Sequence, residues 1–416
     1  MIEIGKALRQ LDQDVIFFSH GGPYESIACE AGFDVVSINP TMPPERANEY
    51  MAYNRGEGSK SLSSSFYTYE ELKAYVPAEA DALRQVNADA VLIGWNLPSY
   101  LSVQLVGIPI IVQQPGPWTA PFFDRKMAEF APAAVGGGIV GLFHYLPMDR
   151  FVNWLMPRVR LWIKPFNQLA LELGLPQYKS TLDFLAGDLT LVMDTPSILG
   201  ISQEEIENYY PAHPEFFHKT PKYKYGGPCY ARLPGEVPEP VRDHFDTSRT
   251  KLYCAMGVSG SPKVLRSIID IVRGIDLQTL IVTTTIIDEN INDSSGQVLF
   301  KPHVPAHLVN PMADIAITHG GAGTVQTAIF SETPLVGIPM HQEQAGNVSL
   351  VKRHGAGIML WKQELTKKNL ASALETLVTD SRFRENMKRL KMEQDQVDGA
   401  SKAAQEIVNF LLHRTA

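Results

Sequence analysis

The sequence has few cysteines, no long hydrophobic run and no excess of basic residues. Its three cysteines, Cys29, Cys229 and Cys254, lack paired or metal-ligand spacing, which argues against a disulfide framework and indicates a reducing compartment. No apolar run reaches the roughly 18 residues that span a bilayer, and we find no hydrophobic signal-peptide region. A formal net charge of -8 argues against non-specific nucleic-acid binding. We therefore expect a cytoplasmic protein without nucleic-acid partners.

Length and composition indicate a soluble globular protein with more than one core. The chain has 416 residues, of which 44% are hydrophobic and 20% charged. Short, nearly all-apolar segments alternate with helix-like stretches, as in parallel sheets that helices cover on both faces. We therefore predict an α/β protein with two Rossmann-like lobes. In the first half, the predicted strands are residues 15–18, 35–38, 90–93 and 108–112, the clearest helix is 70–85, and the Gly- and Ser-rich residues 56–65 form a loop.

A proline-rich segment separates the two predicted lobes. Residues 211–240 contain seven prolines and few periodic apolar positions, which is typical of an interdomain linker. The sequence thus predicts a first lobe over residues 1–215, a linker over 216–248, a second lobe over 249–399 and a last helix over 400–416 that joins the first lobe.

The most informative motif is His-Gly-Gly-Ala-Gly-Thr at residues 319–324. It follows the apolar run 315–318 and precedes the helix-like stretch 325–330, so that a strand leads into a glycine-rich turn that opens a helix. Glycine lets the backbone approach a ligand closely, and the free N–H groups and dipole of the helix attract an anion. We favour phosphate contact over simple capping for the first residue. The motif predicts a diphosphate site formed by His319, Gly320, Gly321, Ala322, Gly323 and Thr324.

A carboxylate and an amide follow a neighbouring predicted strand. The apolar residues 335–338 end at Pro339, and Glu343-Gln344 come four residues later. The carboxyl ends of parallel strands meet at one edge of a sheet, where such folds bind ligands. Because carboxylates and amides hydrogen-bond hydroxyl groups, the pair predicts a sugar site beside the phosphate turn. The alternative is that both residues only begin a helix.

Residues 253–355 resemble the nucleotide-sugar-binding half of the UDP-glycosyltransferase superfamily, the GT-B enzymes of family GT1. Four segments carry the resemblance at the family's spacing: residues 252–260, 303–306, 319–324 and 343–344. The resemblance implies a GT-B fold of two Rossmann-like lobes. It also assigns Gly257 and Ser259 to the donor diphosphate, His303 and Val304 to the nucleobase, and Glu343 and Gln344 to the donor sugar.

Three positions depart from the family pattern. Val258 stands where the family usually has Ser or Thr, and His303 stands where plant members have Trp. Thr327 replaces a Glu that binds ribose hydroxyls in many members. Since an imidazole can still stack and donate a hydrogen bond, uridine and thymidine both stay open as the base.

The resemblance implies an inverting transfer of a hexose from a UDP- or dTDP-sugar to a hydroxyl of a small, hydrophobic acceptor, with no metal ion and no cofactor. A base takes the acceptor proton, and the glycine turn stabilises charge on the leaving diphosphate. Asp12 and Asp14 have the Asp-x-Asp pattern that other glycosyltransferases use for a divalent ion. We interpret them as turn residues between a helix and a strand.

The first lobe opens inside an amphipathic helix, residues 3–11, where a Rossmann-like lobe ordinarily opens with a strand. The resemblance implies a preceding strand that ends in Gly-His, the general base, and an orienting Asp near residues 94–96, where no carboxylate stands. Three explanations compete. Either roughly 20 residues are absent ahead of an internal methionine, which we favour, or His20 is the catalytic base, or the protein is a non-catalytic partner. A nucleotide-sugar epimerase is a weaker alternative, because the spacing of Glu343-Gln344 favours transfer.

The acceptor is indicated only by composition. Residues 131–146 are apolar with three consecutive glycines, and residues 149–167 mix arginines with Phe and Trp. Aromatic and cationic side chains at this density suit a lipid–water interface, and they suit a core helix as well. The segment is thus compatible with peripheral membrane contact and with an apolar acceptor.

Overall fold

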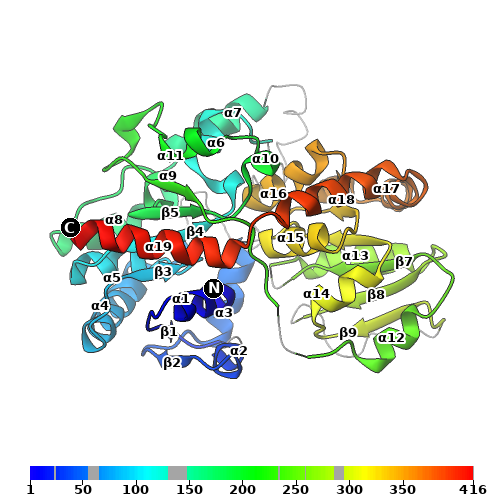
Figure 1. Ribbon diagram of the computed structural model, residues 1–416, viewed down its shortest axis with the longest axis horizontal. Helices are drawn as coiled ribbons and strands as arrows, with labels where there is room; N and C mark the ends of the chain where they lie inside the picture. Colours follow the sequence, from blue (N-terminus) through cyan, green and yellow to red (C-terminus); the bar gives the residue numbers. More distant parts are fainter. Residues whose placement is uncertain are drawn as a thin grey trace.

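The chain folds into two α/β lobes that lie side by side (Figure 1). The computed structural model describes residues 1–22, 25–54, 65–129, 148–232, 235–257, 259–284 and 295–415. The predicted loop 56–65 falls almost wholly outside the described residues, and the apolar segment 131–146 falls entirely outside them.

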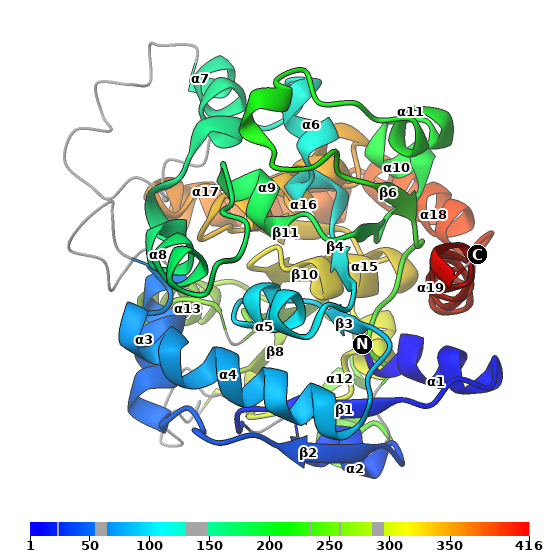
Figure 2. The same cartoon turned by 90° about the vertical axis from the view of Figure 1, so that its left-hand side faces the viewer.

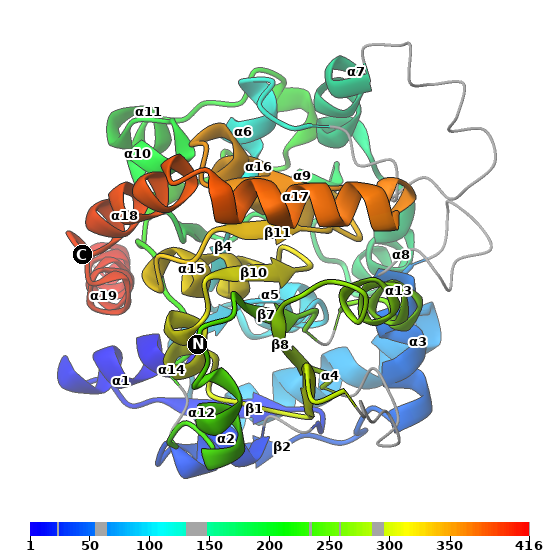
Figure 3. The ribbon, with the colours of Figure 1, turned by 90° about the vertical axis from the view of Figure 1, so that its right-hand side faces the viewer.

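The second lobe contains one parallel sheet, as predicted. Its strand order is β12-β11-β10-β7-β8-β9. Alternate residues of β7 point to opposite faces: Leu252 and Cys254 pack with α13 and α17, whereas Tyr253 and Ala255 pack with α15 and α16 (Figure 3). Because both faces are covered, the strands are almost entirely apolar. The strands are β7 (Lys251–Ala255), β8 (Gln278–Val282), β9 (Val298–Lys301), β10 (Ile315–Thr318), β11 (Leu335–Gly337) and β12 (Gly357–Met359).

The first lobe contains two parallel sheets. One has four strands in the order β3-β4-β5-β6, and the other pairs β1 with β2 (Figure 2). The four strands predicted in this half are present, with ends that shift by up to two residues. The strands are β1 (Ile16–Ser19), β2 (Asp34–Ser37), β3 (Val91–Ile93), β4 (Ile110–Gln114), β5 (Leu189–Val192) and β6 (Tyr223–Tyr225).

Helices surround the sheets of both lobes. The predicted helix 70–85 is α4, which begins with a capping box: Thr68 accepts from the Glu71 N–H, and Glu71 accepts from the Thr68 N–H. The helices are α1 (Ile2–Gln10), α2 (Glu25–Glu30), α3 (Pro44–Asn54), α4 (Tyr69–Gln85), α5 (Ser99–Val106), α6 (Ala120–Asp124), α7 (Met148–Leu155), α8 (Lys164–Glu172), α9 (Thr181–Leu185), α10 (Pro196–Leu199), α11 (Gln203–Glu207), α12 (Glu239–Phe245), α13 (Pro262–Val272), α14 (Ala306–Val309), α15 (Ala322–Phe330), α16 (Gln342–Arg353), α17 (Lys367–Thr379), α18 (Arg382–Gln394) and α19 (Gly399–Thr415).

The carboxyl-terminal helix crosses back to the first lobe. Helix α18 packs on α15 of the second lobe, whereas α19 packs on α1 of the first (Figure 1). Ala403, Ala404 and Ile407 of α19 join the buried cluster of α1, β4 and β5. The last helix therefore lies where the GT-B resemblance placed it.

The four-stranded sheet of the first lobe extends into the predicted linker. Strand β6 lies within residues 216–248 and pairs in parallel with β5. Tyr223 and Tyr225 are buried, and the Tyr225 hydroxyl donates to the Ile201 carbonyl over 2.7 Å. A strand of three residues between prolines has too few alternating positions to stand out by periodicity, which is why the sequence pattern missed it.

A continuous apolar core joins the lobes. One cluster of buried side chains contains Val192, Ile198 and Tyr223 from the first lobe together with Ala255 and Val348 from the second. The facing carboxyl edges of the two large sheets are thus in contact through buried residues, and the predicted donor residues lie beside this contact.

Candidate functional site

The glycine-rich turn joins β10 to α15 and is held by its own hydroxyl groups. Thr318 Oγ1 donates to Thr324 Oγ1 over 2.9 Å, and Thr324 Oγ1 donates to the Gly321 carbonyl over 2.7 Å. Gly320 has a φ of +88°, and a Cβ at this position would lie 2.5 Å from Val348 Cγ2. The turn therefore requires glycine at residue 320 for its backbone conformation and for packing.

Helix α15 begins at this turn without a side-chain cap. Within the described part of the chain, the backbone N–H groups of Ala322, Gly323 and Thr324 have no hydrogen-bond acceptor. Such free donors are expected in the first turn of a helix, where the dipole also favours negative charge. The turn thus presents convergent donors that can bind a phosphate group.

The ring of His319 lies between two glycines from separate strand ends. A Cβ at Gly257 would lie 2.7 Å from His319 Cε1, and a Cβ at Gly321 would lie 2.6 Å from His319 Nε2. Burial lowers the pKa of His319 to about 4, and burial beside this ring lowers the pKa of His341 to about 3. Both rings are therefore neutral near pH 7, so His319 carries one N–H group and no positive charge.

Gln344 connects two segments that were predicted to bind different parts of the donor. Its side chain is 1% exposed. Its Oε1 accepts from the Met340 N–H over 2.8 Å, and its Nε2 donates to Ser259 Oγ over 3.1 Å. The predicted sugar and diphosphate residues are thus neighbours, although these bonds occupy one donor and one acceptor of the amide.

Glu343 lies in the first turn of α16, beside the glycine-rich turn. Its Oε1 accepts from Asn347 Nδ2 over 2.6 Å, and the same amide donates to the Gly320 carbonyl over 2.9 Å. Burial, with a further contribution from the nearby Asp194 carboxylate, raises the pKa of Glu343 to about 7. Since the side chain is still 20% exposed, the carboxyl group can accept from a ligand hydroxyl or donate to it.

The predicted nucleobase segment follows β9 at the same edge of the sheet. His303 is exposed, whereas the Val304 side chain is 4% exposed and belongs to the core between the lobes. Only the backbone of Val304 can therefore face a base. Thr327, at the family's ribose position, is buried, and its hydroxyl donates to the Gly323 carbonyl over 2.8 Å.

A carboxylate that the sequence reasoning missed faces the donor residues from the first lobe. Asp194 follows β5, and its Oδ2 accepts from the Gly116 N–H over 2.7 Å. Its Oδ1 accepts no hydrogen bond from the described residues, and burial raises the pKa of this carboxyl group to about 6. The sequence signal that could have revealed this residue is an Asp at the end of a strand, because strand ends carry ligand-binding groups in this class of fold.

Two close contacts hold the first lobe against α15 and α16 of the second lobe, near the predicted donor residues. The carbonyl of Met193, next to Asp194, accepts from Gln326 Nε2 of α15 over 2.5 Å. Pro117 packs so tightly on α16 that a Cβ at Gly346 would lie 2.4 Å from the Pro117 Cβ. Asp194 therefore lies at the junction of the lobes, near both the phosphate turn and Glu343.

His20 lies at the carboxyl end of β1, where its ring is held on both sides. Its Nδ1 lies 2.9 Å from the Pro40 carbonyl, and its Nε2 lies 3.0 Å from Glu79 Oε1. Both partners are oxygen atoms of the protein, so each ring nitrogen is already occupied by a contact within the first lobe. Glu79 is buried and also accepts from Asn96, Ser99 and Ser102.

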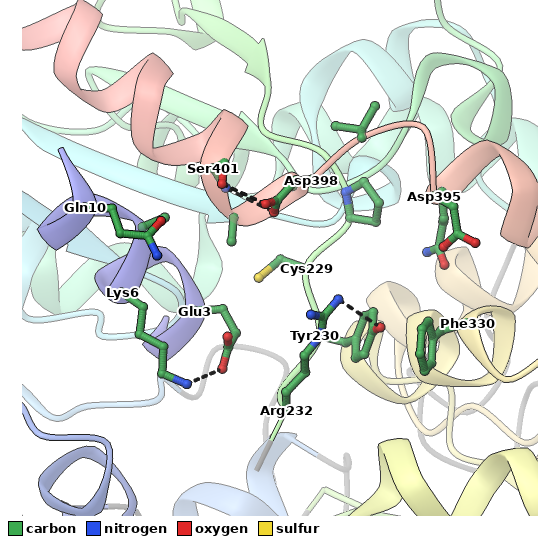
Figure 4. Close-up of a pocket in the computed structure, with 16 residues that line it drawn as sticks. Glu3, Lys6, Gln10, Cys229, Tyr230, Arg232, Phe330, Asp395, Asp398 and Ser401 are labelled. Atoms are coloured by element: carbon green, nitrogen blue, oxygen red, sulfur yellow. Dashed lines mark hydrogen bonds and ion pairs between the residues drawn. The ribbon is translucent and has the colours of Figure 1, made fainter. Parts of the chain in front are cut away.

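A cavity of about 390 Å³ lies where the chain crosses between the lobes (Figure 4). Its walls come from α1, residues 228–232 and residues 394–401, and Figure 4 shows Glu3, Arg232 and Asp398 around it. None of the predicted donor residues lines it. This cavity is therefore separate from the donor site.

The aromatic segment after residue 148 divides into an exposed part and a core part. In α7, the rings of Phe151 and Trp154 stack at 6.0 Å and are 45% and 54% exposed. Phe166 is buried, and Trp162 packs against the same core cluster. No helix within the described ranges is long and apolar enough to cross a membrane.

Comparisons with known proteins agree with this geometry. Residues 297–401 match the family described as UDP-glucoronosyl and UDP-glucosyl transferase. A PGL/p-HBAD biosynthesis glycosyltransferase of Mycobacterium tuberculosis is 22% identical over 329 residues, which cover 78% of this chain and 71% of that protein. A PGL/p-HBAD biosynthesis rhamnosyltransferase of Mycobacterium bovis is 23% identical over 327 residues, which cover 78% and 68%.

Solved glycosyltransferases share the fold along almost the whole chain. The spinosyn forosaminyltransferase SpnP has a TM-score of 0.64 at 12% identity and covers 99% of this chain and 95% of its own. The glycosyltransferase VinC, solved in complex with dTDP, has a TM-score of 0.61 at 15% identity and covers 99% and 96%. The predicted GT-B fold is confirmed, and the match of residues 297–401 supports the predicted resemblance to the UDP-glycosyltransferase superfamily.

Proposed function

We propose that this chain transfers a hexose from a UDP- or dTDP-sugar to a hydroxyl of a small, hydrophobic acceptor, with inversion at the anomeric carbon. The observation that carries the proposal is the convergence of free α15 N–H groups with Glu343 and Gln344 at one edge of the second sheet. The N–H groups suit a diphosphate, and the carboxyl and amide groups suit sugar hydroxyls. Asp194 faces this edge from the first lobe, where an acceptor would approach.

The proposed reaction forms one bond and breaks one. The acceptor oxygen loses its proton to a base and attacks the anomeric carbon, while the bond from that carbon to the diphosphate oxygen breaks. Negative charge therefore grows on the leaving diphosphate. Fixed N–H donors at residues 322–324 and the dipole of α15 stabilise charge at that position, and this stabilisation supports a reaction without a metal ion or cofactor.

The proton acceptor has two candidates in the chain. His20 was predicted from sequence, but both of its ring nitrogens are engaged. Asp194 Oδ1 accepts no hydrogen bond from the residues that the structure describes, the side chain lies at the junction of the lobes, and burial raises its pKa to about 6, which suits a base near pH 7. We therefore favour Asp194.

The two candidates can be separated by a pair of variants. Asp194→Asn keeps the shape of the side chain and is expected to lower kcat about 100-fold, within the usual range for loss of a general base. His20→Gln is expected to lower thermal stability while the folded fraction keeps its kcat. Both kcat values are measured against pH, and the ionisation near pH 6 should vanish only in Asp194→Asn. The reverse pattern would restore His20 as the base.

The enzymatic proposal is tested by incubation with UDP- and dTDP-sugars, including glucose and rhamnose donors, and a panel of phenols, sterols and lipid alcohols. We expect acceptor-dependent release of nucleoside diphosphate and a new glycoside in the mass spectrum. Interconverted donor sugars would instead indicate an epimerase. Nucleotide binding without turnover would indicate a non-catalytic partner protein. Repeating the assay with anionic vesicles tests whether the exposed Phe151 and Trp154 bring the chain to a lipid surface that carries the acceptor.

A further inference from the structure

Gln326 of α15 is buried, and both ends of its amide bind across the junction of the lobes. The residue is 4% exposed. Its Nε2 donates to the Met193 carbonyl over 2.5 Å, and its Oε1 accepts from the Cys229 N–H over 2.9 Å. Met193 directly follows β5, and Cys229 lies on the chain that leaves the adjacent strand β6 (Figure 4). One side chain of the second lobe therefore joins the ends of two neighbouring strands of the first lobe.

The contact with Met193 bears on Asp194, which is the next residue. The Met193 N–H donates to the Gln114 carbonyl over 2.8 Å, inside the four-stranded sheet. Among the backbone hydrogen bonds that the structure describes for residues 192–194, only the one from Gln326 reaches the second lobe. The backbone that carries Asp194 is thus held by its own sheet from one side and by Gln326 from the other.

The same helix carries the free N–H groups of the glycine-rich turn. Ala322 and Gly323 precede Gln326 by less than one and a half turns, which is about 5 Å along the axis at a rise of about 1.5 Å per residue. The place of the Met193 carbonyl relative to these N–H groups therefore depends on a short piece of helix and one side chain. Because the amide is uncharged, it sets this position without adding a charge beside Asp194 or a diphosphate.

Packing alone does not account for a glutamine at this position. The residues of α15 that join the core between the lobes, Val325, Ala328 and Ile329, are apolar. A buried amide costs free energy unless its donor and its acceptor are bonded, whereas an apolar side chain fills the same space without partners. Both partners of Gln326 are backbone groups, so they fix the direction of the amide. The contact with Cys229 thus orients Nε2 towards the carbonyl next to Asp194.

We propose that Gln326 is a positioning residue for the transfer: its amide holds the Asp194 segment at a fixed place relative to the free N–H groups of α15. The inference rests on the proposed function, in which Asp194 takes the acceptor proton and these N–H groups bind the leaving diphosphate. Inversion needs the attacking oxygen on the side of the anomeric carbon opposite that diphosphate. Since the base and the diphosphate site come from different lobes, contacts between the lobes set their separation. A misplacement of about 1 Å can lower a rate about 100-fold.

The test compares three variants of the full chain. Gln326→Met keeps the length of the side chain and removes both hydrogen bonds. Gln326→Glu can make both bonds when its carboxyl group is protonated, but it has no donor for the Met193 carbonyl when it is ionised. Thr333→Val is the matched control, because Thr333 follows α15, is fully buried and donates within the second lobe, to the carbonyls of Asn310 and Ser331.

The kinetic result should separate positioning from stability. At saturating donor, we expect Gln326→Met to lower kcat between about 10- and 100-fold, while calorimetry gives UDP and dTDP affinities within about twofold of the parent chain. For Gln326→Glu, kcat relative to the parent chain at the same pH should fall about tenfold between pH 6 and pH 8.5, as the carboxyl group ionises. The same ratio for Gln326→Met should not depend on pH. Thr333→Val should keep its kcat even where its thermal stability falls as much.

Hydrogen exchange supplies a measurement that needs no turnover. It is followed in peptides that contain residues 193–195 and residue 229, with residues 251–255 of β7 as the internal reference. In Gln326→Met we expect exchange at least about fivefold faster in the first two peptides, because the Asp194 segment and the Cys229 N–H lose their partner. In Thr333→Val both peptides should exchange as in the parent chain.

Three outcomes would overturn the inference. Unchanged exchange in Gln326→Met would show that the amide does not hold the Asp194 segment. Faster exchange with an unchanged kcat would show that the position of this segment does not limit the reaction. Equal losses of kcat and of nucleotide affinity would show that Gln326 acts on the glycine-rich turn instead. A parent chain without turnover would reject the proposed function, and the exchange data would still decide whether Gln326 holds Asp194 in place.

Discussion

Replacing Gly323 by Ala is expected to preserve the fold and to weaken nucleoside diphosphate binding about 100-fold, which corresponds to about 2.7 kcal/mol. Gly323 lies in the first turn of α15, and a Cβ there would meet no atom of the described residues within 4 Å apart from its chain neighbours and the helix's own backbone. The open space beside its N–H is where the diphosphate is proposed to lie. A methyl group would therefore displace the ligand without disturbing the protein.

Gly320→Ala provides the matched comparison. The same methyl group would there meet Val348 and the Gln344 carbonyl at 2.5 and 2.8 Å, in a backbone conformation that disfavours Ala. We expect loss of both stability and binding in this variant. In Gly323→Ala, by contrast, helix propensity predicts stability equal to or about 0.5–1 kcal/mol above that of the parent chain.

Calorimetry with UDP and dTDP, together with thermal unfolding, measures both variants. Normal affinity in Gly323→Ala would place the phosphate site elsewhere. Loss of stability in Gly323→Ala would mean that the added methyl group disturbs the folded protein, so that the space beside α15 is not open. Comparing the affinities for UDP and dTDP also shows whether the site prefers uridine or thymidine. The exposed His303 does not determine this preference.

The second large effect is expected from Glu343→Gln. The pKa of Glu343 is raised to about 7 by burial, above its ordinary value of 4.5. The folded chain therefore binds this proton more tightly than the unfolded chain does. The resulting stability is complete below about pH 4.5 and is lost as the pH rises through about 7, a change on the order of 3 kcal/mol.

Unfolding by urea at pH 5 and pH 8 measures this dependence. We expect Glu343→Gln to lose less stability than the parent chain between these pH values, whereas Glu375→Gln, a control at an exposed position of α17, should follow the parent chain. Equal pH dependence in all three proteins would show that Glu343 is not the buried acid described above.

Ligand binding by Glu343→Gln tests a separate point. If Glu343 contacts the sugar, the variant should bind the nucleotide-sugar about tenfold more weakly, or about 1.4 kcal/mol, while its affinity for the nucleoside diphosphate stays unchanged. Equally weakened binding of both ligands would indicate that the substitution disturbs the phosphate turn. Asn347 would transmit this effect, because it donates to both Glu343 and the Gly320 carbonyl.

The strand, glycine turn and helix of the proposed donor site could be predicted from sequence because their interactions are local. The turn is held by Thr318, Gly321 and Thr324, which lie within seven consecutive residues, and its free N–H groups follow from the start of a helix. Strand, glycine turn and helix thus have to occur in that order in the chain. Spacing alone was enough to place the phosphate turn and the acidic-amide pair on one sheet edge.

The acceptor half depends on contacts between distant residues, which no spacing rule contains. Glu79 accepts from His20 and Ser102, which are 59 and 23 residues away, and these contacts leave the His20 ring without a free nitrogen. Asp194 gains its position from Gly116, 78 residues earlier. A histidine or aspartate at a strand end can be found in a sequence, but its partners decide whether it can act as a base.

The apolar core between the lobes has a thermodynamic consequence. Val192 and Tyr223 of the first lobe share a buried cluster with Ala255 and Val348 of the second, and Pro117 packs directly on Gly346. Any parting of the lobes that admits a nucleotide exposes this surface to water, and closure buries it again. If the lobes part in the free protein, nucleotide binding should therefore lower the heat capacity by more than the ligand's own buried area accounts for.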